Sequence, residues 1–186
     1  MGNIVVSQNI TLDGVVQDPT GEEGIGGWFN RIGDRDRAAW AQAGHEEATR
    51  SAALLLGRRS YEYLAARWTT RTGDWADRLR ALPKYVVSST AVPEPTWGPT
   101  TVISTDLIPK LKEEIDGDIV VNASTQLART LLAENLTDEI RLIAFPFLAG
   151  RGGRLFDETP RSLRLTSTQP VGDNLILSTY ALVQDA

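Results

Sequence analysis

Short runs of aliphatic and β-branched residues alternate along this chain with segments whose apolar residues recur every three or four positions. The short runs predict buried strands at residues 3–7, 52–56, 84–88, 101–104, 118–121 and 139–148, the last one bent at Pro146. The periodic segments predict helices at residues 34–51, 60–68, 75–82, 106–115 and 124–134. Strands that alternate with helices in this way are typical of a mainly parallel sheet.

The final forty or so residues follow a two-residue rhythm instead. Leu163 and Leu165, and then Leu175 and Leu177, alternate with polar residues on either side of a turn at 170–174. This pattern predicts an antiparallel hairpin at the edge of the sheet. We therefore expect a three-layer α/β/α fold, in which helices cover both faces of a mixed, mainly parallel sheet that ends in a C-terminal antiparallel hairpin. No repeat or linker interrupts residues 1–186, so a single domain is expected.

The composition of the chain argues against several kinds of binding partner and of metal site. The 186 residues carry a net charge of -5 and no long basic run, which argues against a nucleic-acid or anionic-membrane surface. Cysteine is absent and histidine occurs once, so thiolate chemistry and a multi-histidine metal site are excluded. No apolar stretch is long enough to span a bilayer. We expect a cytoplasmic protein without a metal.

Two predicted strand-to-helix junctions, at 54–62 and 118–132, aim a helix N-terminus at the carboxyl end of a buried strand. The free N–H groups of a first helical turn attract phosphate, so the pair indicates a split site for a doubly anionic ligand such as a dinucleotide. Gly57 would let backbone approach that ligand, and Arg58 and Ser60 would contact it. The residues leave an alternative equally open, in which Gly57 is only a turn, Ser60 a helix cap and the arginines are solvated.

Ordered motifs give a family resemblance, although the G-x-G-x-x-G and P-loop fingerprints are absent. Residues 56–62 resemble the G-R-x-[ST]-[YW]-E segment of dihydrofolate reductases, and residues 84–89 resemble the strand that follows it. The later segments 118–132, 136–139 and 150–156 resemble one branch of that fold. This branch is related to the reductase domain of the bifunctional riboflavin-biosynthesis deaminase-reductase. The resemblance covers nearly the whole chain.

The resemblance implies an NADPH-dependent reductase on a dihydrofolate-reductase-like fold that forms homodimers. It would transfer a hydride to a small, heterocyclic, pyrimidine- or pterin-like acceptor. Arg58 and Ser89 would face the adenosine 2′-phosphate and Ser60 the pyrophosphate, while Asp13 and Gly14 would lie in the loop near the nicotinamide. The full set of cofactor-binding residues carried over is Gly14, Gly57, Arg58, Ser60, Ser88, Ser89, Ala123, Ser124 and Thr125.

Ala123 departs from the family pattern, because glycine is usual at this point of the second phosphate-binding turn. A methyl group there would obstruct a pyrophosphate or an unusual backbone angle. This departure keeps open an alternative function, a non-catalytic nucleotide- or ligand-binding protein on the same scaffold. The helix at 34–51 also gives no clear match to the pterin-binding carboxylate of dihydrofolate reductases, so folate reduction is not favoured.

The residues for substrate chemistry each have two interpretations. Asp13 is either a proton donor, and hence catalytic, or a loop acid that accepts backbone N–H groups. Trp28 either stacks on a flat heterocycle or anchors its Gly-rich loop in the core. Arg151 and Arg154 either meet a phosphorylated substrate or are solvated. The substrate pocket suggested by the sequence therefore consists of Trp28, Arg151 and Arg154.

Overall fold

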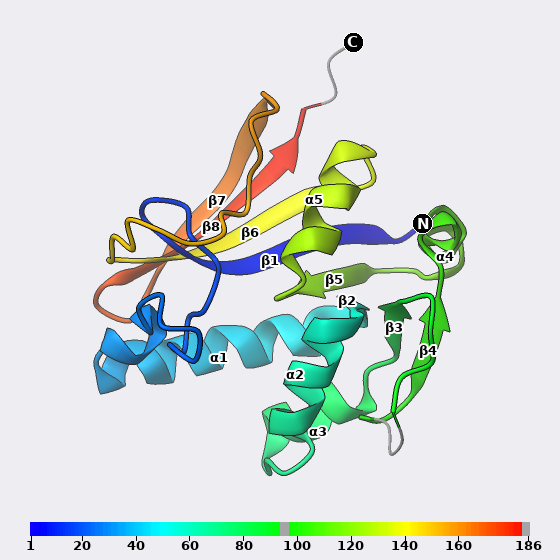
Figure 1. Cartoon of the computed structure of the whole chain (residues 1–186), viewed down its shortest axis with the longest axis horizontal. Helices are drawn as coiled ribbons and strands as arrows, with labels where there is room; N and C mark the ends of the chain where they lie inside the picture. Colours follow the sequence, from blue (N-terminus) through cyan, green and yellow to red (C-terminus); the bar gives the residue numbers. More distant parts are fainter. Residues whose placement is uncertain (94–96, 184–186) are drawn as a thin grey trace. The chain divides into compact units, whose positions relative to one another are not determined.

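The computed structural model describes residues 1–93 and 97–183. Its strands are β1 (Asn3–Thr11), β2 (Ser51–Gly57), β3 (Lys84–Val87), β4 (Thr100–Ile103), β5 (Asp118–Asn122), β6 (Glu139–Phe145), β7 (Leu163–Val171) and β8 (Leu175–Leu182). Its helices are α1 (Asp34–Arg50), α2 (Arg58–Trp68), α3 (Asp74–Ala81), α4 (Ile108–Glu114) and α5 (Thr125–Ala133), with short 3-10 turns η1 (Trp28–Arg31) and η2 (Thr105–Leu107). The strands are hydrogen-bonded in the order β4-β3-β2-β5-β1-β6-β8-β7 (Figure 1). The predicted mixed sheet of α/β class is confirmed.

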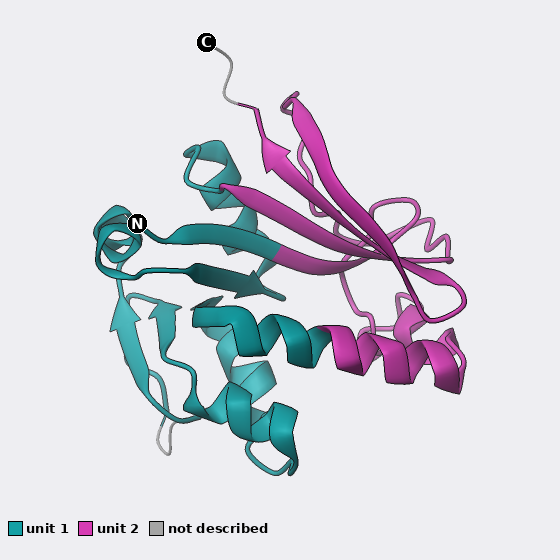
Figure 2. Cartoon of the chain, turned by 180° about the vertical axis from the view of Figure 1, so that it is seen from behind, with its two compact units in different colours: residues 1–6, 44–137 teal, residues 7–43, 138–186 magenta. Residues whose placement is uncertain are grey.

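The chain divides into two compact units, which are described in turn (Figure 2). Unit 1 consists of Met1–Val6 and Gly44–Thr137, and unit 2 of Ser7–Ala43 together with the chain from Asp138 onward. Strand β1 and helix α1 each begin in one unit and end in the other.

Unit 1 contains the parallel part of the sheet. β2 pairs in parallel with β3 and with β5, and β3 pairs in parallel with β4. The last residues of three strands lie level, because Gly57 is opposite Val87 and Val87 is opposite Ile103. The segments that leave these strands therefore start from the same edge of the sheet, which is where ligands bind in α/β proteins.

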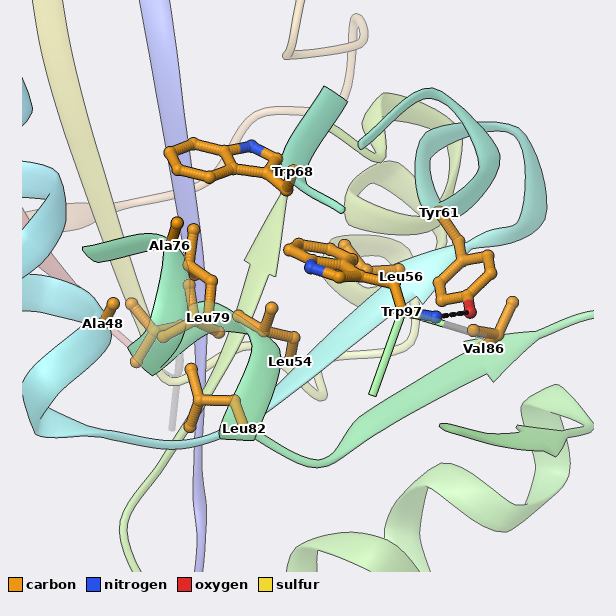
Figure 3. Packing of buried hydrophobic residues seen from close by; sticks show 12 residues of the cluster. Ala48, Leu54, Leu56, Tyr61, Trp68, Ala76, Leu79, Leu82, Val86 and Trp97 are labelled. Atoms are coloured by element: carbon orange, nitrogen blue, oxygen red, sulfur yellow. Dashed lines mark hydrogen bonds between the residues drawn. The ribbon is translucent and has the colours of Figure 1, made fainter. Parts of the chain in front are cut away.

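The core of unit 1 fixes helix α2 against this edge (Figure 3). Tyr61 and Trp68 of α2 are buried together with Leu54 and Leu56 of β2. The Tyr61 hydroxyl accepts the backbone N–H of Trp97 at 2.9 Å, a bond drawn as a dashed line in Figure 3. The apolar face predicted for this helix is thus confirmed, and it holds the first turn of α2 at the end of β2.

Lys84, at the start of β3, is a buried charge that the strand pattern did not reveal. Its ammonium group donates to the backbone carbonyls of Leu79 and Leu82 and lies 4.6 Å from the centre of the Trp97 ring. Burial, and then the neighbouring Arg80, lower the pKa of Lys84 to about 8. The lysine satisfies carbonyls at the end of α3 that have no partner within the helix.

Unit 2 contains the antiparallel strands. β6 pairs with β8 and β8 with β7, so the predicted C-terminal hairpin is confirmed. Its turn is held by Asp36 of α1, which is 2% exposed and accepts the backbone N–H groups of Asp173 at 2.6 Å and Asn174 at 3.0 Å. Gly172 in that turn has a φ of +69° and leaves no room for a Cβ beside Asp36.

Several boundaries differ from the prediction. The strand expected at 3–7 continues to Thr11, and two other differences have a clear physical cause. The strand expected at 139–148 ends at Phe145, because Pro146 has no N–H to donate and the N–H of Phe147 turns back to the carbonyl of Phe145 at 2.8 Å. The helix expected at 106–115 starts at Ile108, after the 3-10 turn η2, and no side chain caps it. Neither difference moves a strand out of its place in the sheet.

Candidate functional site

A pocket of about 510 Å³ lies within unit 1, where β2 passes into α2 and β5 passes into α5. It is lined by Gly57, Arg58, Arg59, Ser60, Val87, Thr105, Ala123, Ser124, Thr125, Gln126, Leu127 and Thr130. The two junctions singled out in the sequence therefore open onto one shared pocket. Six of the nine residues expected to bind the cofactor line it, namely Gly57, Arg58, Ser60, Ala123, Ser124 and Thr125.

Ser124 ties the two junctions together. Its hydroxyl oxygen accepts the backbone N–H of Gly57 at 3.0 Å and donates to the carbonyl of Asn122 at 3.0 Å. The residue is only 4% exposed. Ser124 thus holds the start of α2 beside the start of α5, and its hydroxyl is already engaged inside the protein.

Both helices begin without a side-chain cap. Gly57 is the N-cap of α2 and Ser124 the N-cap of α5, and neither makes a capping hydrogen bond to its helix. The Ser60 hydroxyl, in the first turn of α2, makes no hydrogen bond to a described residue, so it is not the cap that the alternative interpretation required. First-turn N–H groups have no acceptor within a helix, so donors remain available at both helix starts, except the N–H of Thr125, which bonds to the carbonyl of Ala123.

Gly57 keeps space open between the two helix starts. Its φ of −72° and ψ of 152° are angles that any residue adopts. A Cβ built at this position would lie 3.9 Å from both Cβ and Oγ of Ser124. The glycine is therefore not required by its backbone; its missing side chain leaves room in the pocket.

Ala123 has an unusual backbone angle, which its departure from the family's glycine had raised as a concern: its φ of +58° lies in the left-handed region. The N–H of Ser124 bonds to the carbonyl of Asn122 at 2.6 Å, and the N–H of Thr125 bonds to the carbonyl of Ala123 at 2.8 Å. Two three-residue turns thus follow each other between β5 and α5. An L-residue in the left-handed region costs about 1–2 kcal/mol, so this turn is strained by its alanine.

Two arginines stand at the start of α2 with different surroundings. Arg58 donates through Nε to Glu62 at 2.8 Å and through Nη1 to the hydroxyl of Thr90. Arg59 is exposed, and among residues 1–93 and 97–183 it has no ion-pair partner. One cation is therefore held in place at the pocket, and the other is free to meet an anion.

Ser88 and Ser89, the two remaining candidates in unit 1, do not line the pocket. The Ser88 hydroxyl accepts the backbone N–H of Thr90 at 3.1 Å. Ser88 therefore contributes to the site indirectly, because it fixes Thr90, whose hydroxyl accepts a hydrogen bond from Arg58.

Sequence reasoning gave no role at this site to five of the residues that line the pocket, which are Val87, Thr105, Gln126, Leu127 and Thr130. It named Thr90 only as a further hydroxyl donor, and it did not identify Glu62 and Thr90 as the partners of Arg58. For some of these residues, the position in the sequence does indicate a place near the pocket. Thr105 follows the carboxyl end of β4, and Glu62 lies one helical turn after Arg58. Gln126 and Thr130 are also one turn apart, on the face of α5 that lines the pocket.

The remaining candidates lie in unit 2. Asp13 accepts the hydroxyl of Thr11 at 2.6 Å and the backbone N–H groups of Ala149 at 3.1 Å and Gly150 at 2.7 Å. These bonds, that of Thr11 first, lower the pKa of Asp13 from 3.8 to about 2. The carboxylate is therefore ionised at neutral pH and closes a turn around Gly14, whose φ is +84°. This geometry matches the loop-acid interpretation, and a group with this pKa carries no proton to donate at neutral pH.

Trp28 is a core residue, which corrects its assignment to the substrate pocket. Its ring is 1% exposed, packs edge-on against Phe145 with centroids 4.9 Å apart, and donates to the carbonyl of Gln17. No face of the ring is free to stack on a ligand. Arg151 is exposed and donates to the carbonyl of Gly24 at 3.0 Å, and Arg154 forms an isolated bridge with Val15. A role of these arginines in substrate binding stays a prediction.

Within the described part of the chain, no group of three acidic or histidine side chains is arranged to hold a metal ion. Over the same residues, no helix combines the length and the apolar character needed to cross a membrane.

Solved structures resemble this chain over almost its full length. A protein from Shewanella sp. PV-4 that is assigned to riboflavin biosynthesis is 21% identical, with a TM-score of 0.71 and coverage of 98% of this chain and 99% of that one. Dihydrofolate reductase from Enterococcus faecalis, solved with NADP(H) and RAB-propyl, is 12% identical, with a TM-score of 0.58 and coverage of 98% and 97%. These likenesses establish the dihydrofolate-reductase-like fold.

A longer relative comes from Thermotoga maritima. This diaminohydroxyphosphoribosylaminopyrimidine deaminase/5-amino-6-(5-phosphoribosylamino)uracil reductase is 15% identical, with a TM-score of 0.64, and the match covers 98% of this chain but 57% of that one. No curated protein sequence matches the chain significantly. The model of the RibD C-terminal domain matches residues 3–177, which is nearly the whole chain. The resemblance found in the sequence motifs is therefore confirmed, and the chain belongs to the RibD C-terminal domain family.

Proposed function

We propose that this protein is an NADPH-dependent oxidoreductase that transfers a hydride to a small heterocyclic acceptor of the pyrimidine or pterin type. Membership in the RibD C-terminal domain family supports an oxidoreductase-type function. The Thermotoga maritima relative is named as a uracil reductase, and the Enterococcus faecalis relative was solved with NADP(H). These names support the acceptor class and the cofactor proposed here.

One observation carries the proposal: two uncapped helix starts open onto a single pocket that also contains a free arginine. First-turn N–H groups together with a guanidinium fit a ligand with separate phosphate groups. The pocket volume, about 510 Å³, lies in the range typical of small-molecule and cofactor sites. A purely structural pair of helix starts would be expected to carry capping side chains.

NADPH would supply the hydride when it is bound, and residues of this pocket would bind its phosphate groups. Arg58 and Arg59 would hold the 2′-phosphate, and the first-turn N–H groups after Gly57 and Ser124 would hold the pyrophosphate. The open space beside Gly57 would admit the sugar-phosphate backbone. Asp13 and Gly14 remain predicted neighbours of the nicotinamide, and Asp13 would act there by shaping its loop rather than by giving up a proton.

The test is a titration of the full chain with NADPH and with NADH, followed by tryptophan fluorescence or calorimetry. We expect a clear preference for NADPH. Arg58→Ala should weaken NADPH binding by about 1–3 kcal/mol, the cost of losing a charged hydrogen-bond partner. Lys110→Ala removes an exposed cation that does not line the pocket and serves as the control. Equal affinity for both nucleotides would contradict the assignment of the 2′-phosphate to the arginines.

A second candidate function is a non-catalytic nucleotide- or ligand-binding protein on the same scaffold. The strained Ala123 favours it, because this turn is where a methyl group would meet a pyrophosphate. If the natural chain fails to bind NADPH and Ala123→Gly gains binding, the non-catalytic function is the better description. If the natural chain already binds NADPH tightly, the methyl group is tolerated and the reductase is supported.

We also propose that the protein forms a homodimer through its C-terminal hairpin. β7 is exposed along nearly its whole length, and Leu163, Leu165 and Ile176 are 39%, 52% and 49% exposed. Exposed apolar residues along an edge strand favour contact with another chain. Light scattering of the natural chain and of Leu165→Lys would test it, with a dimer expected for the first and a monomer for the second. A monomeric natural chain would refute the proposal.

A further inference from the structure

The guanidinium of Arg58 is held on two sides before any ligand arrives. Its Nε donates to Oε1 of Glu62 at 2.8 Å, a contact between residues one turn apart on α2. Its Nη1 donates to the hydroxyl of Thr90, which follows β3. An arginine has five N–H donors, so three remain for an anion at the pocket.

Thr90 is itself anchored to the sheet. Its backbone N–H donates to the hydroxyl of Ser88 at 3.1 Å, and the backbone N–H of Ser88 donates to the carbonyl of Ile103 at 3.1 Å. The position of the Arg58 side chain is therefore fixed by its own helix and by the end of the neighbouring strand. A long side chain that is 39% exposed would otherwise move among several rotamers.

The carboxylate of Glu62 has two opposite effects on a phosphate near Arg58. It repels the phosphate, but Glu62 is 40% exposed, so water and salt screen this repulsion. It also removes the need to order Arg58 on binding, a saving that corresponds to roughly three- to tenfold in affinity for one long side chain. Glu62 favours phosphate binding only if the positioning effect exceeds this screened repulsion, and variants at position 62 measure the difference.

We propose that Glu62 and Thr90 are positioning residues that preorganise Arg58 and so set the preference for a 2′-phosphorylated over an unphosphorylated dinucleotide. This inference rests on the proposed function, because it takes NADPH as the ligand of the pocket. It assigns a role to the acidic residue at the end of the Gly57–Glu62 motif and to a threonine outside the pocket lining.

The experiment compares Glu62→Ala and Glu62→Gln in the full chain. Glutamine keeps an oxygen that can accept from Arg58 Nε and removes the charge, whereas alanine removes both. We expect Glu62→Ala to weaken NADPH binding about three- to tenfold and to leave NADH binding within about twofold. Glu62→Gln should keep NADPH binding within about twofold of the natural chain. Thr90→Val should shift the preference for NADPH over NADH in the same direction as Glu62→Ala does.

Glu114→Ala is the matched control, because Glu114 forms an exposed ion pair with Lys110 one helical turn away on α4, outside the pocket. It should change neither affinity, and its melting temperature should match that of Glu62→Ala. An NADPH-to-NADH preference that Glu62→Ala leaves unchanged or increases would overturn the positioning role. Equal weakening of both nucleotides would overturn it as well, because it would indicate general damage to the pocket. A natural chain that binds NADPH without any preference over NADH would instead overturn the proposed function.

Discussion

Ala123→Gly should make the protein more stable, against the usual effect of an alanine-to-glycine change. The φ of +58° at Ala123 costs an L-residue about 1–2 kcal/mol, and glycine does not pay this cost. Glycine in turn makes the unfolded chain more flexible, which costs about 0.4–1 kcal/mol. The balance is a gain of about 0.5–1 kcal/mol in the free energy of unfolding. For a chain of this size, 1 kcal/mol raises the melting temperature by about 2–4 °C.

The assay is urea denaturation together with differential scanning calorimetry on the natural chain and two variants. Ala133→Gly is the control, because Ala133 is the exposed last residue of α5 and has ordinary helical geometry. Glycine there should lower the free energy of unfolding by up to about 1 kcal/mol. Opposite signs for the two substitutions are the expected result. If Ala123→Gly lowered stability as much as Ala133→Gly does, the turn would not be strained and the reasoning would fail.

The remaining predictions concern binding, a buried hydrogen bond and acid stability. Gly57→Ala should leave the melting temperature unchanged but weaken NADPH binding about tenfold or more, since its new Cβ projects toward Ser124; unchanged affinity would show that this space is not used. Tyr61→Phe should cost about 1–3 kcal/mol in urea denaturation, because the buried N–H of Trp97 loses its acceptor, and a loss below about 0.5 kcal/mol would contradict the bond. Asp13 has its pKa lowered to about 2 in the folded protein, so its stabilising effect should be complete above about pH 4 and disappear as the pH falls toward 2. In melting curves recorded against pH, Asp13→Asn should therefore differ from the natural chain at pH 7 and converge with it near pH 2; a constant difference would refute this assignment.

The sequence predicted the order and nature of the strands and helices well, because burial imposes a strong rhythm on them. The run at 52–56 and the two-residue alternation around Leu165 both became strands of the expected kind. Errors arose where hydrogen bonding rather than burial sets the boundary. Pro146 ended a strand that its apolar neighbours would have continued, and a 3-10 turn replaced the first residues expected in the helix that starts at Ile108.

The site was less predictable than the fold, since its partners come from different parts of the chain. The junction motifs correctly brought Gly57 and Ser124 to one pocket. They did not reveal that the Ser124 hydroxyl is already hydrogen-bonded inside the protein, or that Thr90 contacts Arg58. Sequence spacing indicates which residues reach a sheet edge, but only coordinates indicate which of their atoms remain unpaired there.

The uncapped starts of α2 and α5 have a consequence for mutagenesis of this pocket. Many of its donors belong to peptide groups, which no substitution other than proline removes. Binding measurements on a series of alanine variants would therefore underestimate the contribution of the pyrophosphate contacts. They would report mainly on the side chains that contact the 2′-phosphate. The same property would let the lining side chains diverge during evolution while affinity for phosphorylated ligands persists.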